Sequence, residues 1–477
     1  MHRAKAGNDG QLDRMPKELI DWLNKPVGRF LRIEAAAAAF LLVATLLAMS
    51  LANSPWSEHY FSWWQVEFGL RLGQMEISHS LLDWINDAVM TLFFFVVSLE
   101  LKRELVLGEL RQPRQALLSV CAAMGGMVVP AGIYLAMMWG HSAQHGWGMV
   151  MATDTAFVVG CLALLGSRIP LQLRVFLLSL AIVDDIGAIL VVAIGYGEAL
   201  NYQALALAGI GLLAVRGMAW LGIRNLMLYF LLGAGIWLAM DHSGIHPTVT
   251  GVILGLMTPT LKWVSDARLH QILHNVVAHP PGQKWSGNTQ ARMMLRTAEA
   301  AAREALSPVE RLEIMLHPWV GFLIMPLFAF ANAGVSMGDI TFSGSLVPAI
   351  VVSFIIGKPL GVFLFSWFAV KLGLAVRPAE LSWPMLMAGG MLCGIGFTMA
   401  LFIAGLGMAA SDLNEAKLAI LVASVCSALL GLAFLIGFSV PSSLQKSSRH
   451  RQNSDKLPKE SANGSQRATR ALQSQTK

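Results

Sequence analysis

Residues 173–196 read LRVFLLSLAIVDDIGAILVVAIGY, an apolar stretch with two adjacent acids, Asp184 and Asp185, near its middle. A helix needs roughly 20 apolar residues to cross the hydrocarbon of a bilayer. Helix is the form expected here, because backbone groups in lipid must find their partners within the segment. A charge at the bilayer centre costs at least about 2.5–3.5 kcal/mol on insertion scales. The acid pair therefore predicts a functional site inside a membrane protein.

The composition of the whole chain agrees with this prediction. Of 477 residues, 55% are hydrophobic and 13% are charged, and the mean hydropathy is +0.58. A soluble domain averages about 25% charged residues, so this chain has too little charge to cover a water-facing surface. Its four cysteines lie within apolar segments, where we expect packing residues and neither a disulfide framework nor a zinc site. They are Cys121, Cys161, Cys393 and Cys426. No cofactor is expected.

Twelve apolar segments are predicted to cross the membrane, so the fold class is an all-α polytopic membrane protein. The segments lie at 35–52, 81–101, 117–139, 147–165, 173–196, 203–221, 226–240, 246–261, 314–335, 344–370, 383–406 and 416–439. The seventh and eighth are short and separated by a tight turn, so a re-entrant pair remains an alternative there.

The positions of the basic residues support this number and order of spans. All but three of the 35 Lys and Arg fall on one side of the predicted membrane, together with both chain ends; the exceptions are Arg71, Lys358 and Lys417. Cytoplasmic loops are enriched in Lys and Arg. We therefore expect both termini in the cytoplasm and a bacterial-type inner (plasma) membrane as the location.

Segments outside the spans complete the expected organisation. Residues 1–33 form a cytoplasmic arm, 34–440 the membrane domain, and 441–477 a disordered basic tail. The basic charge is expected to contact lipid and not nucleic acid. Residues 262–313 form a cytoplasmic insert with an amphipathic helix at Thr289–Leu306. The aromatic-rich stretch Ser54–Ser80 is either an interfacial belt or a small extramembrane hairpin.

Two further charges are expected at membrane depth. Asp154 has Thr153 and Thr155 beside it, so an unwound helix there would present the carbonyl and hydroxyl oxygens that hard cations prefer. Lys358 lies in the tenth span, where an unpaired ammonium would lose its proton. Its expected partner is Asp184 or Asp154. It acts either as a structural bridge or as a proton carrier, and both interpretations stay open.

The acid pair suggests exchange chemistry. Two nearby carboxylates in a low-dielectric site cannot both ionise cheaply, so they hold protons or an alkali cation, but scarcely both at once. The eleventh span contains Gly389-Gly390 and Gly394-Ile395-Gly396, and paired interrupted helices are a sequence indicator of a transporter site. His270 and His274 lie four residues apart, but their pattern lacks the acid of a metalloprotease motif.

At this point the chain resembles the NhaA family of sodium/proton antiporters over roughly Glu34 to Phe438. The motifs that carry the resemblance are Trp84-Ile85-Asn86-Asp87, Leu99-Glu100-Leu101-Lys102-Arg103-Glu104-Leu105, Ala152-Thr153-Asp154, Val183-Asp184-Asp185-Ile186-Gly187-Ala188, Leu327-Phe328-Ala329-Phe330-Ala331-Asn332-Ala333-Gly334, Gly357-Lys358-Pro359-Leu360-Gly361 and Gly394-Ile395-Gly396-Phe397-Thr398.

The resemblance implies an inverted-repeat transporter in which the interrupted spans four and eleven cross. It implies that Asp184 and Asp185 bind sodium and protons, that Asp154 and Thr153 stabilise charge at the crossing, and that Lys358 pairs with an acid of the site. It assigns Asp87 to ion access. Residues resembling those tied to pH activation are Glu100, Glu104, His246, Glu313 and His317. The hairpin at 54–80 would mediate a homodimer.

The expected function is electrogenic, pH-regulated export of cytoplasmic Na⁺ or Li⁺ in exchange for external H⁺, without enzyme activity. Two alternatives come from other classes of protein. A passive cation channel would move sodium without coupling it to protons. A membrane enzyme using an acid pair would need further residues: an intramembrane aspartyl protease usually has Gly-x-Gly-Asp, whereas Ala181-Ile182-Val183 precede Asp184.

Overall fold

The computed structural model describes residues 26–72, 75–108, 113–197, 199–223, 225–262, 264–278, 289–338 and 344–438. The tail expected at 441–477 and most of the arm expected at 1–33 lie outside these residues. In chain order, with η for π-helical or 3₁₀ turns, the elements are α1 (Pro26–Ala52), α2 (Ser57–Trp64), β1 (Glu67–Leu72), β2 (Met75–Ser80), α3 (Leu81–Trp84), η2 (Ile85–Val89), α4 (Met90–Val106), α5 (Pro113–Met137), η4 (Ser142–Met151), α6 (Thr155–Leu165), η5 (Gly166–Arg168), α7 (Leu171–Gly195), α8 (Tyr202–Trp220), α9 (Leu226–Asp241), α10 (Val249–Met257), α11 (Asp266–Val277), α12 (Thr289–Glu304), α13 (Pro308–Trp319), η6 (Val320–Ile324), α14 (Met325–Asn332), α15 (Leu346–Val352), η7 (Ser353–Gly357), α16 (Lys358–Lys371), α17 (Trp383–Cys393), α18 (Phe397–Gly407) and α19 (Ala410–Phe438).

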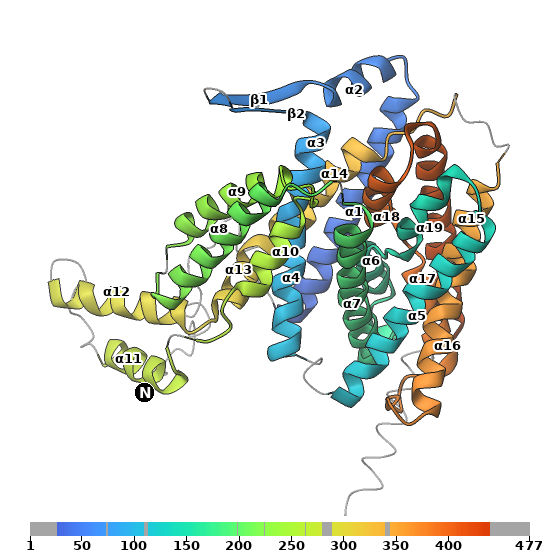
Figure 1. The fold of residues 1–477 in the computed structure, drawn as a ribbon. Coiled ribbons are helices and arrows are strands. Elements are labelled where there is room, and N and C mark those ends of the chain that lie inside the picture. Colours follow the sequence, from blue (N-terminus) through green and yellow to red (C-terminus); the bar gives the residue numbers. More distant parts are fainter. Residues whose placement is uncertain are drawn as a thin grey trace, which may run out of the picture.

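The chain is a multi-pass membrane protein. Eight helices among the described residues are long and apolar enough to cross a bilayer, and the number is ten if each of two bent helix pairs counts as one span. The eight are Glu34–Ala52, Leu81–Val106, Ala116–Met137, Leu171–Gly195, Tyr202–Trp220, Pro308–Asn332, Leu346–Lys371 and Ala410–Phe438. Figure 1 shows most of them side by side in one bundle, with α8 and α9 at one flank and α11 and α12 beyond their ends.

Two of the apolar segments are interrupted, as the sequence predicted. Between η4 and α6 the chain bends by 42°, and between α17 and α18 by 48°. The first break leaves Ala152 and Asp154 in extended conformation before α6 begins. The second break is made by Gly394, Ile395 and Gly396. Each break frees backbone groups that an unbroken helix would have used internally.

Three spans contain a π-helical turn that the sequence did not predict. One turn, η2, carries Asp87; another, η6, precedes Pro326; and the third, η7, ends directly before Lys358 and Pro359. Proline has no backbone N–H, and its ring clashes with the carbonyl four residues earlier. Widening the preceding turn relieves that clash, so each proline accounts for the π-turn ahead of it. Such turns often mark functional sites.

Glycine contacts fix the helix that carries Lys358. A Cβ atom at Gly125 of α5 would lie 2.2 Å from the carbonyl oxygen of Gly361, and one at Gly361 would lie 2.1 Å from that of Gly125. Only hydrogen fits on either side, so α5 and α16 meet backbone to backbone. Lys358 lies one turn before this contact.

Of the two alternatives expected for Ser54–Ser80, the structure shows the hairpin, whose two short strands depart from the all-α expectation. β1 and β2 pair antiparallel, with Glu67 opposite Ser80 and Leu72 opposite Met75. α2 precedes them, and Figure 1 shows all three elements at one end of the molecule. Polar and apolar residues alternate along much of the sequence of β1, a pattern typical of a strand.

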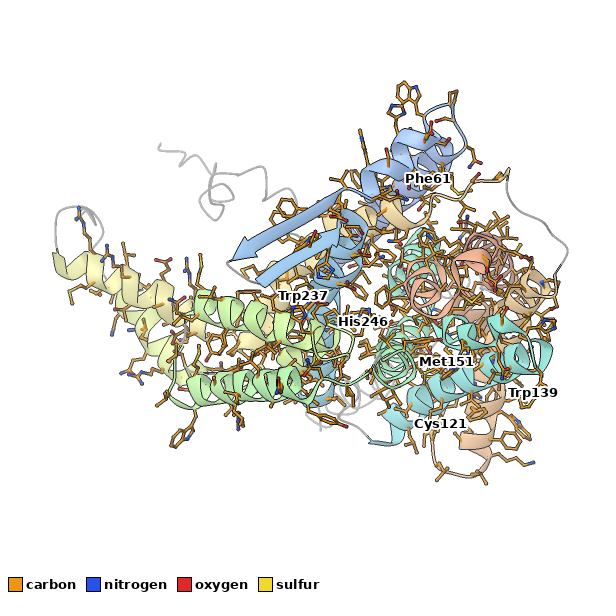
Figure 2. The ribbon with its side chains drawn as sticks, turned by 45° about the horizontal axis from the view of Figure 1, so that its top comes forward. Phe61, Cys121, Trp139, Met151, Trp237 and His246 are labelled. Carbon is orange, nitrogen blue, oxygen red and sulfur yellow. The ribbon has the colours of Figure 1, made fainter. Side chains whose placement is uncertain are left out.

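α8 and α9 form a flanking unit with a hydrophobic cluster of its own, and α10 joins this unit to the bundle by packing on α4 through Gly251 and Gly255. The cluster contains Ala208, Val215, Ile236, Ala239 and Met240. It is separate from the large core cluster of the bundle. In Figure 2 the labelled Trp237 and His246 lie near the hairpin. The Trp237 indole donates to Thr91 Oγ1, 3.0 Å away. Trp237 also stacks on Trp84 with ring centroids 5.7 Å apart, so this end of the unit is fixed to the α3–α4 span.

Candidate functional site

Asp154 joins the two helix breaks. It caps α6 by accepting from the Phe157 N–H at 3.1 Å. Its other carboxylate oxygen accepts from the backbone N–H of Thr398 at 3.1 Å and from the Thr398 hydroxyl. Its own N–H donates to the Ile395 carbonyl at 2.6 Å. The side chain is fully buried, and these bonds supply the donors that a buried carboxylate requires.

Lys358 pairs with Asp184 and not with Asp154. Its Nζ lies 2.6 Å from Asp184 Oδ2 and 2.7 Å from Thr153 Oγ1, and it also donates to the Met151 carbonyl. The Thr153 hydroxyl faces both Asp184 Oδ2 and the Cys393 carbonyl. Three oxygens therefore surround the ammonium, and the Thr153 hydroxyl contacts both members of the ion pair.

Asp185 lies beside this network and makes a single hydrogen bond within the described residues. Its Oδ2 accepts from the Thr155 hydroxyl at 3.2 Å, and the side chain is almost fully buried. The second oxygen of Asp184, Oδ1, is also buried and has no hydrogen-bond partner among the residues that the structure describes. Buried polar atoms without partners are rare in proteins and call for an explanation, such as a bound ion or water.

The broken helices supply further oxygens around the acids. Thr153 comes from the break before α6, Thr155 is the first residue of α6, and the Cys393 carbonyl comes from the end of α17. An alkali cation prefers hard oxygen ligands from carboxylates, hydroxyls and carbonyls. Asp184 Oδ1 and the carboxylate of Asp185 are the charged ligands available to it.

Asp87 lies in a second polar group. His246 Nε2 is 3.5 Å from Asp87 Oδ1, and His246 Nδ1 is 2.8 Å from Thr248 Oγ1. The imidazole ring also meets the edge of Phe402 in α18, with centroids 5.6 Å apart. Asp87 and His246, which the resemblance assigned to different roles, therefore share one contact.

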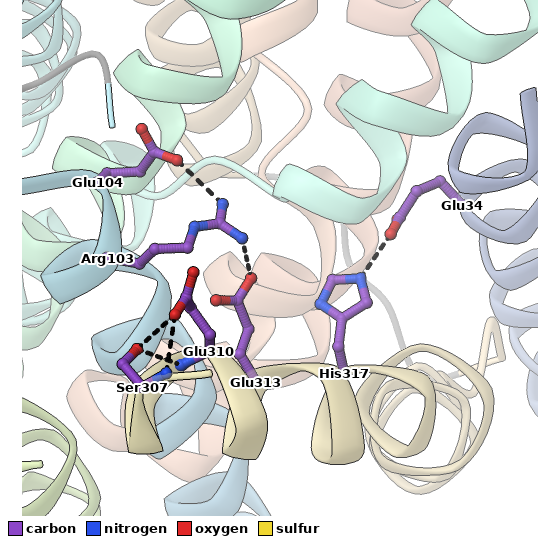
Figure 3. Close-up of polar contacts among 7 residues, drawn as sticks. All are labelled: Glu34, Arg103, Glu104, Ser307, Glu310, Glu313 and His317. Carbon is purple, nitrogen blue, oxygen red and sulfur yellow. Dashed lines mark hydrogen bonds and ion pairs between the residues drawn. The ribbon is translucent and has the colours of Figure 1, made fainter. Parts of the chain in front are cut away.

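Glu104, Glu313 and His317 belong to a third group at the other end of α4 (Figure 3). Arg103 bridges Glu104, at 2.9 Å, and Glu313. His317 Nε2 lies 2.6 Å from Glu34 Oε1. Glu100 is half-buried and within electrostatic range of both Arg103 and His317.

Several participants were not singled out from the sequence. They are Thr398, Arg103, Glu34 and the backbone carbonyls of Met151 and Cys393. Thr155 was expected here, because its hydroxyl flanks Asp154 in the sequence. Glu34 is 283 residues from its partner His317, and no local pattern links two residues so far apart.

The sequence also places the chain among known proteins. Residues 28–435 match the family described as Na⁺/H⁺ antiporter 1. The chain is 59% identical to a Rhizobium meliloti (strain 1021) protein named Na(+)/H(+) antiporter NhaA, across 90% of this chain and 98% of the relative. It is 56% identical to a Vibrio vulnificus (strain CMCP6) protein named Na(+)/H(+) antiporter NhaA 2, across 90% and 96%. An Acidiphilium cryptum (strain JF-5) protein, Na(+)/H(+) antiporter NhaA 1, is 57% identical across 90% and 95%. The resemblance predicted from the motifs is thereby confirmed, and the chain belongs to the Na⁺/H⁺ antiporter 1 family.

Proposed function

We propose that this chain exchanges Na⁺ for H⁺ across a bacterial plasma membrane at a site formed by Asp184 and Asp185. The observation that carries the proposal is that the two acids differ in their hydrogen-bond partners. Lys358 and Thr153 hold one oxygen of Asp184, whereas the only hydrogen bond of Asp185 in the described part of the chain comes from the Thr155 hydroxyl. The family of the chain and the names of its relatives support the two ions as substrates.

The exchange follows from competition for the same oxygens. Sodium binds to the ionised Asp185, the free oxygen of Asp184 and nearby hydroxyl and carbonyl oxygens, and protons displace it when they neutralise the carboxylates. Ionised carboxylates without a bound cation are costly to enclose in surroundings of low dielectric constant. The site therefore changes its exposure from one side of the membrane to the other readily only when it holds sodium or protons. With more than one proton entering per sodium, the exchange is electrogenic. Li⁺ fits the same hard-oxygen site and is a second expected substrate.

The breaks beside Asp154 and at Gly394–Gly396 are proposed to be the crossing point of spans four and eleven. Asp154 contacts Ile395 and Thr398 from the other broken helix, which supports a junction that shifts as the site turns from one side to the other. We further propose that the short helices α9 and α10 are membrane spans, giving twelve. The distribution of Lys and Arg supports cytoplasmic termini.

Two outlying groups have proposed roles as well. The Asp87–His246 contact serves ion access, and the group of Arg103, Glu100, Glu104, Glu313 and His317 responds to pH. Histidine and clustered carboxylates change charge near physiological pH when their surroundings shift them. The β1–β2 hairpin is the proposed contact of a homodimer, since it offers a strand edge outside the bundle.

Purified protein in liposomes tests the exchange. With a pH-sensitive dye inside, added Na⁺ should move protons outward, and Asp185→Asn should abolish that movement while the protein still inserts and folds. Asp266→Asn is the matched control, because the side chain of Asp266 in α11 is 87% exposed and the residue is distant in sequence from Asp184 and Asp185. Sodium uptake with no opposing proton movement at any pH would instead favour the passive channel. Full activity in Asp185→Asn would refute the site.

A further inference from the structure

The start of α18 is capped by a residue of another helix. The first four N–H groups of a helix need partners from outside the helix. Gly396 holds the cap position before α18 and has no side chain that could accept from them. Phe397, the first residue of α18, donates its backbone N–H to the Ser424 hydroxyl oxygen, 3.1 Å away. Ser424 lies in the middle of α19, so a neighbouring span supplies the acceptor that the sequence before α18 lacks.

α19 packs against both halves of the interrupted span, α17 and α18 (Figure 1). A Cβ atom at Gly431 of α19 would lie 2.6 Å from the Leu392 side chain of α17, so the two helices are in close contact there. Ser427 lies one turn along α19 from Ser424. A Cβ atom at Gly394, directly after α17, would lie 2.6 Å from Ser427 Oγ. One continuous helix therefore contacts the break from both sides.

The hydroxyl groups of the two serines differ in their partners. Both side chains are almost fully buried. Ser424 Oγ accepts from Phe397, whereas Ser427 Oγ has no hydrogen-bond partner among the residues that the structure describes. A buried N–H that loses its acceptor is left with the full cost of its removal from water. Removing the Ser424 hydroxyl therefore leaves a backbone group at the break unpaired, and removing the Ser427 hydroxyl does not.

The next residue of α18 leads to the acid pair. Thr398 donates its backbone N–H to Asp154 Oδ2 at 3.1 Å, and its hydroxyl donates to the same oxygen. Asp154 directly follows Thr153 in the chain, and the Thr153 hydroxyl contacts Asp184. Hydrogen bonds and short pieces of backbone therefore connect Ser424 of α19 with the carboxylates of the site.

We propose that Ser424 is a positioning residue for ion exchange: its hydroxyl fixes the first turn of α18, so that the donors of Thr398 stay directed at Asp154. This inference rests on the exchange function proposed above and adds α19 to the elements that support the site. Groups that hold a binding site in place need partners that hold them in turn. Ser424 is such a partner for Thr398, although it does not touch the acid pair itself.

Loss of the Ser424 hydroxyl has a defined consequence at the site. The Phe397 N–H becomes a buried donor without an acceptor, and the first turn of α18 must shift to give it one. That shift moves Thr398 away from Asp154 and releases the neighbouring Thr153. The oxygens around the acids are then less well placed for sodium, so sodium binds more weakly while the acids themselves are unchanged.

Exchange kinetics of the full chain in liposomes test the proposal with variants of the two serines. Ser424→Ala should raise the apparent KM for Na⁺ about fivefold, the factor expected for one typical hydrogen bond, with little change in the maximal rate per folded protein. Ser427→Ala is the matched control, because it removes the same atom one turn away without freeing a buried donor, and its KM should equal that of the native chain. Ser424→Cys fills the same space with a weak acceptor and should resemble Ser424→Ala.

A double variant shows whether Ser424 acts through Thr398. Thr398→Val removes one of the two bonds from α18 to Asp154, so Ser424→Ala should raise the KM by a smaller factor in that background than in the native chain. Equal factors in the two backgrounds would overturn the proposal. A purely structural role would lower the amount of folded protein and leave the KM unchanged, and that result would also overturn it, as would a native KM in Ser424→Cys.

The native chain in the same assay separates this inference from the proposed function. If the native chain couples sodium to protons and Ser424→Ala keeps the native KM, only the role of Ser424 is wrong. If the native chain moves sodium with no opposing proton movement, the exchange function is wrong, and the positioning role in exchange is wrong with it.

Discussion

Lys358 and Asp184 form an ion pair that is closed to solvent on both sides: Nζ lies 2.6 Å from Oδ2, and the two side chains are 1% and 0% exposed. Removing two charges from water is costly, and their attraction offsets that cost only with good geometry and further hydrogen bonds. Thr153 and the Met151 carbonyl supply those bonds. The pair therefore holds one oxygen of Asp184 against Lys358, and the other oxygen of Asp184 and the carboxylate of Asp185 keep spare coordination.

Breaking this pair from either end should destabilise the protein strongly. Lys358→Gln leaves the Asp184 carboxylate buried without its cation, which costs about 3–5 kcal/mol in comparable sites. Lys358→Gln/Asp184→Asn removes both charges and should recover much of that loss in denaturant unfolding in detergent. Lys262→Gln is the control, because its ion pair with Asp266 is exposed. If the losses in unfolding free energy of Lys358→Gln and of Asp184→Asn simply added up in the double variant, the two residues would not be coupled.

The same variants separate the two roles of Lys358. If Lys358 is only a bridge to Asp184, the folded Lys358→Gln/Asp184→Asn protein still binds sodium in competition with protons through Asp185. If Lys358 carries a proton, the number of protons moved per sodium falls in that variant. The ratio of proton to sodium flux in liposomes, measured below the unfolding temperature, distinguishes the two.

Thr155→Val should weaken sodium binding by removing the hydroxyl that contacts Asp185. The hydroxyl lies 3.2 Å from Asp185 Oδ2, within the shell where an ion bound to that oxygen would find a neutral ligand. We expect the apparent KM for Na⁺ to rise several-fold with little loss of protein stability. Thr155→Ser keeps the hydroxyl and should behave close to the native protein. Equal KM values in both variants would exclude Thr155 from the site.

The sequence predicted the parts of this site that depend on local chemistry. Acids at membrane depth and glycines within an apolar run are visible without a fold, because lipid makes each of them costly or disruptive. The break at Asp154 followed from the same reasoning. The family itself was recognisable from the motifs that contain these residues.

The parts that depend on long-range packing were not predictable. The sequence left two partners open for Lys358. Asp154 instead contacts Thr398, 244 residues away, across the second break. The π-turn before Lys358 depends on Pro359 within an otherwise continuous helix. From the sequence alone, a proline in an apolar segment predicts a simple kink as well as a π-turn. For Ser54–Ser80 the sequence left a hairpin and an interfacial belt open, because the aromatic residues of this stretch suit both.

Alkaline pH should loosen the hairpin through Tyr60. The Tyr60 hydroxyl donates to the Phe330 carbonyl, its ring packs edge-on against Phe330, and burial raises the pKa of Tyr60 from 10.0 to about 12. Between these two values the unfolded state has released the proton and the folded state has not, so stability falls as pH rises through this window. The loss amounts to about 2–3 kcal/mol at most. Unfolding curves across the window should therefore decline less steeply for Tyr60→Phe than for the native chain, and parallel curves would contradict the assignment.

Gly125→Ala should displace Lys358 without touching a charged residue. The new Cβ would lie 2.2 Å from the Gly361 carbonyl oxygen and 2.7 Å from the Phe365 side chain, so α5 and α16 must separate. Overpacking of this kind costs about 1–3 kcal/mol, and the separation moves Lys358, one turn away, from Asp184 and Thr153. We expect a lower melting temperature together with slower exchange in liposomes. Gly132→Ala on the same helix is the matched control, because its Cβ would meet nothing within 4 Å, and replacing an exposed helical glycine by alanine stabilises by up to about 1 kcal/mol. If Gly125→Ala lowered stability but left the exchange rate unchanged, the position of Lys358 would not depend on the α5–α16 contact.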